Sequence, residues 1–353
     1  MPQSNDSAPE PAAVTWTPPQ SEQIPALQIS MGRWLSHPTF LMTTCGALEA
    51  GQGTIVPAAD TPLESTVILH AEEANRLSSA QPFTLDAETT EDALAAGAAL
   101  PDWSVEPDDL PAPEGLMVFD RPIGYCQGRA RVPLPVVACS WGPSPQTAPP
   151  GGAVWVTFWS AGDRESLIAE SIAHGTPPAE ARYNVETGTP PLLWADEALV
   201  CWSASGTPIF TPTSRCVPTD EVTGIVVHQE AAPWLQTVFA AWNFIRNQVV
   251  EITEARAPRA ERRRAERTGK PLPSVRVVSA RRRTSSAPPS APTGRSVSVR
   301  FPVRGFWRDQ PFGQGRSLRK RIWIKRHWRG PEDAPVRIRP VVIVVEKPTD
   351  LTE

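Results

Sequence analysis

The sequence predicts an α+β protein in which a β-rich acidic N-terminal domain precedes a small basic C-terminal domain. Short runs rich in Val, Trp and Phe lie between Pro- and Gly-rich stretches over residues 23–230, which is typical of strands joined by long loops. The clearest helical periodicity comes later, over residues 231–254, and strand-like runs follow it. The charge also changes sign near residue 250. We therefore expect a disordered tail over residues 1–22, an acidic domain over 23–230 and a basic domain over 231–353.

The acidic domain is predicted to be mostly strand. Proline supplies 41 of the 353 residues, and because each proline removes a backbone donor, long helices should be few. Two segments are predicted as helices, Glu91–Ala98 and Arg164–His174. The predicted strands are Thr66–His70, Leu116–Asp120, Val132–Ser140, Val154–Ser160 and Ala198–Ser203.

The basic domain is predicted to contain one long helix and about four antiparallel strands. Apolar residues at intervals of three and four place one stripe along a helix over residues 231–254. This stripe consists of Leu235, Val238, Trp242, Ile245, Val249 and Ile252. The predicted strands lie in Ser274–Arg282, Ser296–Trp307, Arg321–Trp328 and Val341–Glu346. The Arg-rich segment near 255–272 is a solvated charged helix or a flexible arm, and the Pro-rich segment near 284–295 is a flexible linker.

The distribution of charge is the most informative feature of the composition. Residues 1–250 contain 9 Lys+Arg and 28 Asp+Glu, whereas residues 251–353 contain 25 Lys+Arg and 10 Asp+Glu. The two parts therefore carry −19 and +15, which together give the net charge of −4. Such asymmetry predicts a polyanionic partner for the basic end, or a contact between the two halves.

The cysteines and the absence of long apolar runs predict a cytoplasmic location. The five cysteines are odd in number and form no C-x-x-C pair, which favours buried free thiols over a disulfide framework. The first residues lack the basic and apolar regions of a signal peptide. No run approaches the roughly 18 apolar residues of a membrane span, so no membrane partner is expected.

The basic end mixes cations with aromatic residues in a way that is typical of nucleic-acid binding. Arginine matches phosphate bidentately, and tryptophan offers a face on which bases stack. On a strand, Arg321, Trp323, Lys325 and His327 fall on the same face. The candidate nucleic-acid-binding residues are Arg281, Arg282, Arg283, Arg304, Trp307, Arg308, Arg319, Lys320, Arg321, Trp323, Lys325 and Arg329. The expected partner is DNA or RNA.

Two alternatives remain open for the basic end. Its cations could pair with an acidic protein partner or with the chain's own N-terminal domain, in which case Trp307 and Trp323 are core residues. It could also be a metal-independent ribonuclease-like toxin, with His327 as a weak candidate for acid–base catalysis. Arg304, Arg308 and Lys325 would then stabilise charge on the phosphate. The scattered histidines and cysteines predict no metal site, and no phosphate-loop motif or cofactor is expected.

One segment of the basic end supports a family resemblance. It reads VRGFWRDQPFGQGRSLRKRIWIKRHWRGPEDAP, Val303–Pro335. With the apolar helix and Arg-rich spacer before it, this segment resembles the C-terminal part of a family of uncharacterised actinobacterial and actinophage proteins. The resemblance covers about the last third of the chain and, more loosely, LPDWSVEPDDLPAPEGLMVFDRPIG. It implies an association with phages or mobile elements and no particular activity. That family carries histidine where this sequence has Phe306, so the resemblance does not support a histidine catalyst there.

Overall fold

The structure of the chain is a computed structural model. It describes residues 14–100, 105, 107–128, 132–143, 152–202, 210–213, 217–218, 224–247, 250–280, 300–303, 305–325, 327–331 and 334–335. The predicted strand Val341–Glu346 and the linker near 284–295 lie outside these residues.

Helices and strands alternate along most of the described chain. The helices are α1 (Ile24–Trp34), α2 (Pro38–Glu49), α3 (Pro62–Ser79), α4 (Ala87–Ala98), α5 (Arg164–Ala173), α6 (Pro178–Gly188), α7 (Ala232–Arg246) and α8 (Arg259–Arg267). The first strands are β1 (Ile55–Val56), β2 (Gln81–Leu85), β3 (Gly115–Phe119), β4 (Gly124–Gln127), β5 (Pro133–Pro143), β6 (Ala153–Ala161), β7 (Leu192–Cys201) and β8 (Phe210–Thr213). The others are β9 (Val217–Pro218), β10 (Ile225–His228), β11 (Val250–Ala255), β12 (Val275–Ala280), β13 (Phe301–Val303), β14 (Phe306–Phe312), β15 (Leu318–Ile324) and β16 (His327–Arg329).

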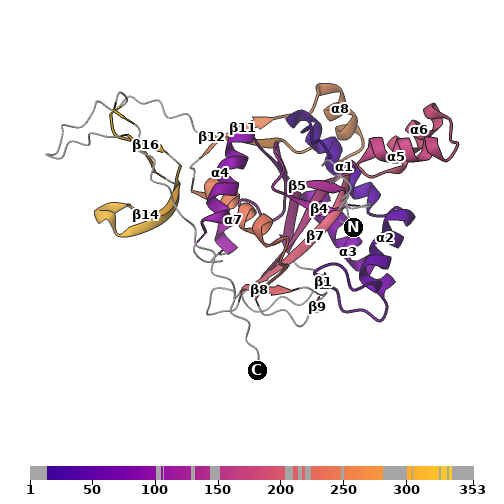
Figure 1. Cartoon of the computed structure of the whole chain (residues 1–353), viewed down its shortest axis with the longest axis horizontal. Coiled ribbons are helices and arrows are strands. Elements are labelled where there is room, and N and C mark those ends of the chain that lie inside the picture. The colour runs from indigo at the N-terminus through magenta and orange to yellow at the C-terminus, as the bar shows by residue number, and fades with distance from the viewer. Residues whose placement is uncertain are drawn as a thin grey trace, which may run out of the picture.

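A mixed ten-stranded sheet forms the centre of the molecule (Figure 1). Its order is β11–β12–β2–β3–β5–β6–β7–β10–β8, and β4 pairs with β5 beside this path. The strands β12, β2 and β3 run parallel, whereas neighbours from β3 through β5, β6 and β7 to β10 are antiparallel. Helices α4 and α7 lie on one face of the sheet and α1, α2 and α3 on the other. The predicted α+β class is confirmed.

Each face of the sheet buries its own apolar core. On the α4 and α7 face, Phe83 and Trp141 pack with Trp242 of α7. On the opposite face, Ile24 of α1 belongs to the same core as Leu116 of β3. Because both faces are covered, β3, β5 and β6 are buried along nearly their whole length. Their continuous apolar sequences follow from this double burial.

The main sheet extends across the domain boundary predicted between residues 230 and 231. Helix α7 is almost entirely buried against the sheet, and β12 pairs with β2, so both belong to the same core as residues far upstream. The change of charge near residue 250 therefore does not coincide with a break in the fold. A separate small sheet domain does exist at the C-terminal end, where β13 pairs with β16 and β14 pairs with β15, both antiparallel.

Many of the predicted elements are found, but the prediction that residues 23–230 are mostly strand with few long helices was wrong, since α1 to α6 all lie there. Strands were expected within β3, β5, β6 and β7, and helices within α4 and α5, and each is present. The segment Thr66–His70, predicted as a strand, lies in α3. Its helix starts at a favourable cap, because Pro62 follows Thr61, whose side chain accepts a hydrogen bond from the backbone nitrogen of Glu64. Tertiary burial of one face then outweighs the strand preference of the Val-Ile-Leu run.

The long C-terminal helix is also shorter than predicted. Helix α7 ends at Arg246, and Ile252, placed on its apolar stripe by sequence spacing, lies on β11 opposite Val278. The Arg-rich segment after it does form a helix, α8, with no buried residues, and Gly269 follows in the left-handed conformation. Residues 14–22, predicted to be part of a disordered tail, contact the sheet: Val14 donates from its backbone nitrogen to the carbonyl of Pro133, and Trp16 donates from Nε1 to the carbonyl of Phe119.

A close crossing of α4 and α7 leads to the first testable prediction. A Cβ on Gly97 of α4 would lie 2.8 Å from the backbone nitrogen of Thr237 in α7. We expect Gly97→Ala to lower the free energy of unfolding by about 1–3 kcal/mol, because backbone atoms cannot move aside as a side chain can. In the control Gly46→Ala, a Cβ would meet nothing within 4 Å, so this change in α2 should add about 0.5–1 kcal/mol. Urea denaturation measures both, and a stabilising Gly97→Ala would contradict the close approach.

Candidate nucleic-acid interface

The hairpin β14–β15 carries most of the described candidate residues. Its register pairs Trp307 with Trp323 and Arg308 with Ile322. Because side chains alternate along each strand, the hairpin has two faces. One face holds Trp307 and Trp323, and the other holds Phe306 and Arg308. The first face is turned toward α4 and α7, as the following contacts show.

Two tryptophans anchor the hairpin to the body of the protein. Trp323 is buried and belongs to the core that contains α4 and α7. Trp307 packs on Trp323 and on Phe244 of α7, and its Nε1 donates a hydrogen bond to the carbonyl of Ala96 at 3.0 Å. The indole of Trp323 is therefore not available for base stacking in this structure, and that of Trp307 is half-buried.

Lys325 strengthens the same attachment. Its ammonium pairs with Asp92 and with Glu88, 3.1 Å away, both on α4. Burial lowers the pKa of Lys325, but its hydrogen bonds to the two carboxylates prevail and raise it above its ordinary value. The pKa of Asp92 is raised as well, because burial of this carboxyl outweighs the attraction of the ammonium. Arg321 also has a partner, since its Nε lies 3.7 Å from Asp309 Oδ1 within the hairpin.

The other face of the hairpin presents cations and aromatic rings to solvent. Phe306 and Phe312 are 43% and 41% exposed, and Trp328 on β16 is 46% exposed. The ammonium of Lys320 lies 5.8 Å from the ring centre of Phe312. Within the part of the chain that the structure describes, five cations of this region form no ion pair with a carboxylate. Arg308 and Lys320 lie on this face, Arg319 on the tryptophan face, Arg316 in the turn and Arg329 on β16. The name basic aromatic face is used below for these residues of the hairpin, its turn and β16: Phe306, Arg308, Phe312, Arg316, Arg319, Lys320, Trp328 and Arg329.

A tight turn joins the two strands and positions two of these cations. Gly313 and Gly315 both have positive φ, and Arg316 follows at φ 57°. Glycine adopts this left-handed conformation without steric cost, so both positions suit the turn. Arg319 then donates from Nη1 to the carbonyl of Arg316 at 2.7 Å, which holds its guanidinium beside the turn.

A hollow of about 420 Å³ lies between the end of the hairpin and the body. Small-ligand sites fall in the range of about 300–1,000 Å³. From the body, the lining includes Leu100, Val105, Asp109, Phe239, Asn243 and Asn247. From the hairpin, it includes Asp309, Phe312, Arg319, Lys320 and Arg321. Three predicted candidate residues, Arg319, Lys320 and Arg321, therefore meet at one concave site.

The remaining predicted residues are distributed differently. Arg281, Arg282, Arg283 and Arg304 lie outside the described residues. The sequence predicted Arg321, Trp323, Lys325 and His327 on one face of a single strand, Arg321–Trp328. Trp323 and Lys325 contact the body, and Arg321 shares their face. The placement of His327 was wrong, because β15 ends at Ile324 and His327 lies on β16, which pairs with β13. The predicted binding residues did not include Phe306 and Phe312, although the same alternation puts both on the face of the hairpin that does not carry Trp307 and Trp323. The Arg-rich helix α8 lies at another end of the molecule (Figure 1).

His327, the weak catalytic candidate, lies on β16 and is exposed. Its Nδ1 lies 3.0 Å from the carbonyl oxygen of Lys325. Among the described residues no carboxylate or second imidazole contacts it, and the ammonium of Lys325 is held by α4 instead. The described geometry therefore assembles no acid–base pair at this position.

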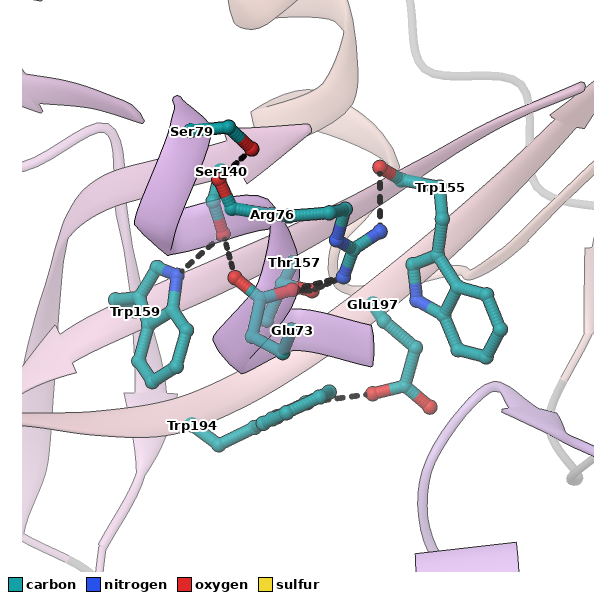
Figure 2. Close-up of polar contacts among 9 residues, drawn as sticks. All are labelled: Glu73, Arg76, Ser79, Ser140, Trp155, Thr157, Trp159, Trp194 and Glu197. Atoms are coloured by element: carbon teal, nitrogen blue, oxygen red, sulfur yellow. Dashed lines mark hydrogen bonds and ion pairs between the residues drawn. The ribbon is translucent and has the colours of Figure 1, made fainter. Parts of the chain in front are cut away.

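A second polar cluster lies inside the protein, between α3 and the sheet (Figure 2). Glu73 and Arg76 of α3 form an ion pair there. Arg76 also donates to the carbonyl of Trp155 at 3.1 Å and to Thr157 Oγ1 at 3.0 Å. Ser140 and Thr157 donate hydrogen bonds to the Glu73 carboxylate. All of these polar side chains are buried, so the cluster binds α3 to β5 and β6 and cannot contact a substrate.

A related network joins the loop before β1 to β7 and β10. Thr54 donates from its backbone nitrogen to Glu197 Oε1 at 2.9 Å and from its hydroxyl to Asp196. The other oxygen of Asp196 lies 3.0 Å from His228 Nδ1. Burial, and then the charge of Asp196, raises the pKa of Glu197 to about 7. The hydrogen bond with Asp196 raises the pKa of His228.

Three further observations concern metal sites, membrane-spanning helices and cysteines. Among the residues described, no group of three or more His, Cys, Asp and Glu is placed to hold a metal ion. Across the same residues, no helix has both the length and the apolar character needed to cross a bilayer. Cys45, Cys139 and Cys201 are buried free thiols.

Comparisons with known proteins assign this chain to no family. No protein-family model, curated protein or solved structure matches this chain. The resemblance to actinobacterial and actinophage proteins therefore stays an expectation from the sequence.

Proposed function

We propose that this protein binds nucleic acid through the basic aromatic face of its C-terminal sheet domain. The observation that carries the proposal is that the two small C-terminal sheets, β14–β15 and β13–β16, carry five cations without described ion pairs together with three exposed rings. Cations would contact phosphates, and rings would stack on unpaired bases at about 1–3 kcal/mol per base. Because stacking needs an unpaired base, a single strand is the preferred form. DNA and RNA are equally compatible with these contacts.

The experiment uses the full chain, because α7, β11 and β12 belong to the main sheet and a fragment from residue 231 would lose their partners. We expect binding to a single-stranded oligonucleotide at about 50 mM salt. Five phosphate contacts on a single strand give a loss of affinity of roughly 100-fold between about 50 and 200 mM salt. Fluorescence anisotropy measures both affinities. The absence of binding at the lower salt concentration would end the proposal.

Matched variants distinguish binding by the basic aromatic face from general attraction to the positive charge of the chain. Arg308→Ala with Lys320→Ala removes two cations from the basic aromatic face and should reduce the salt slope by about one unit for each lost phosphate contact. The control, Arg259→Ala with Arg263→Ala, removes two exposed cations from α8 and should leave the slope almost unchanged. Equal effects of the two pairs would indicate attraction to overall charge instead of a defined face.

A second candidate function is charge matching between the basic end and acidic protein. The ion pairs of Lys325 with Glu88 and Asp92 favour it, because they join the C-terminal sheet to the acidic part of the same chain. An acidic partner protein would then take the place of nucleic acid on the basic aromatic face. Binding to an acidic polypeptide with no binding to oligonucleotides at low salt would support this function over the first. The phage association and the cytoplasmic location remain predictions from the sequence.

A further inference from the structure

The solvent-facing side of the hairpin β14–β15 carries rings and cations and no carboxylate. The register places Phe306, Arg308, Gln310 and Phe312 of β14 on this side, with Leu318 and Lys320 of β15, and none of these six residues is buried. Asp309 is the one acidic residue within residues 306–324, and it lies on the opposite side, which lines the hollow. No carboxylate of the hairpin therefore repels a phosphate on the solvent-facing side.

Two rings flank two cations along this side. Phe306 and Phe312 begin and end β14, and Arg308 lies two residues after Phe306. Lys320 is paired across the hairpin with Gln310, two residues before Phe312. Its ammonium lies 5.8 Å from the centre of the Phe312 ring. The order from one end of the strand to the other is therefore ring, cation, cation, ring.

The backbone fixes the distance between the two rings. A strand rises about 3.3 Å per residue, so the six steps from Phe306 to Phe312 place these side chains about 20 Å apart. Pairing with β15 along the whole of β14 maintains this separation. Both rings are exposed, at 43% and 41%. A ligand that stacks on both rings must therefore extend over about 20 Å.

This distance corresponds to a definite length of nucleic acid. A sugar–phosphate unit has six backbone bonds, twice as many as an amino-acid residue, so one nucleotide step reaches at most roughly 7 Å. A stacked strand advances about 3.4 Å per nucleotide. Extending over about 20 Å therefore takes about three steps in a fully extended strand and about six in a stacked one. The phosphates of these steps pass Arg308 and Lys320, which lie between the rings.

We infer that this side of the hairpin binds one single strand of about four to seven nucleotides along β14, with one base stacked on Phe306 and another on Phe312. A mononucleotide or dinucleotide reaches only one ring. The bases of a duplex are covered by their neighbours and reach neither ring. Because every base has a face that can stack, the site selects by length and not by sequence. The inference rests on the proposed function, because the same hairpin supplies the contacts of both.

Oligonucleotides that retain only two bases test the spacing directly. Each is a single-stranded DNA of about ten units in which every position except two thymines is abasic, so the number of phosphates is constant. We expect the full chain to bind most tightly when the thymines lie about three to six steps apart. Adjacent thymines should bind about 5- to 150-fold more weakly, the effect of losing one stacked base. Fluorescence anisotropy at about 50 mM salt measures these affinities. An affinity that does not depend on the separation would contradict the inference.

Variants of the two rings assign the effect to them. Phe306→Ala and Phe312→Ala should each abolish the dependence on separation and weaken the best-spaced oligonucleotide by about 5- to 150-fold, whereas Phe306→Tyr and Phe312→Tyr keep a ring and the dependence. Leu318→Ala removes an exposed apolar side chain paired with Phe312, and this matched control should bind as the parent does. Because all three positions are exposed, the melting temperatures should equal that of the parent. Parental binding by both alanine variants of the rings would refute the inference.

The inference and the proposed function can fail separately. Tight binding whatever the separation of the bases, unchanged by the loss of either ring, would overturn the two-ring site and leave the proposed function standing, because cations alone would then hold the strand. The absence of any oligonucleotide binding would overturn both.

Discussion

Replacing Arg76 by methionine is expected to lower the free energy of unfolding by about 3–5 kcal/mol. Arg76 and Glu73 are 3% and 0% exposed, so the substitution leaves a carboxylate without its cation inside the protein. Burial lowers the pKa of Arg76 to about 9, which still leaves the guanidinium charged at neutral pH. The lost partner is therefore a full positive charge. Urea denaturation at neutral pH measures the change.

The double variant Glu73→Leu with Arg76→Met provides the control. Removing both charges leaves no unpaired ion, so most of the stability lost in Arg76→Met should return. The hydroxyls of Ser140 and Thr157 then lack the carboxylate to which they donate, so part of the unfolding free energy should remain lost. A double variant as unstable as the single one would show that shape, and not charge pairing, decides the stability of this interface.

Stability is expected to fall as the pH rises from about 4.5 to 7, by about 3 kcal/mol through Glu197 alone. The pKa of this carboxyl is raised from 4.5 to about 7 by burial and then by Asp196, although hydrogen bonds from Trp194, Thr54 and Ile55 oppose the shift. In this interval the folded protein keeps a proton that the unfolded chain has lost. The contribution of Glu197 is therefore complete below pH 4.5 and is lost as the pH passes through 7. The hydrogen bond with Asp196 also raises the pKa of His228, so the contribution of this imidazole to stability is likewise lost as the pH rises, at higher pH values.

Glu197→Gln tests this assignment. The variant should show a flatter dependence of the unfolding free energy on pH, because glutamine does not titrate. Glu251→Gln, which replaces an exposed carboxylate on β11, is the matched control and should keep the parental profile. The profiles come from urea denaturation at a series of pH values. A parental slope in Glu197→Gln would refute the role of this carboxyl.

The candidate interface shows how far local patterns reach. Alternation along the predicted strand Arg321–Trp328 correctly placed Arg321, Trp323 and Lys325 on one face, but it wrongly added His327, which lies on β16. It could not say which face meets the body, because that depends on Ala96 and Asp92 of α4, more than 200 positions away in the sequence. The face with Trp307 and Trp323 packs on the body, so the rings that the hairpin leaves exposed are those of Phe306 and Phe312. The hollow likewise combines residues of α7, of the segment that follows α4 and of the hairpin, which no short stretch of sequence contains together.

The same distinction holds for the whole protein. The sequence by itself determined the opposite charges of its two parts and the strands β3, β5, β6 and β7, because these follow from composition and short-range periodicity. For the segment of α8 it left a charged helix and a flexible arm as alternatives, and the structure has the helix. Tertiary structure alone decided that α3 is a helix, that α7 ends at Arg246, and that β12 joins β2 in one sheet. These outcomes depend on burial against distant segments. Burial stabilises by the apolar area removed from water, and a short stretch of sequence does not contain the surface that will cover it.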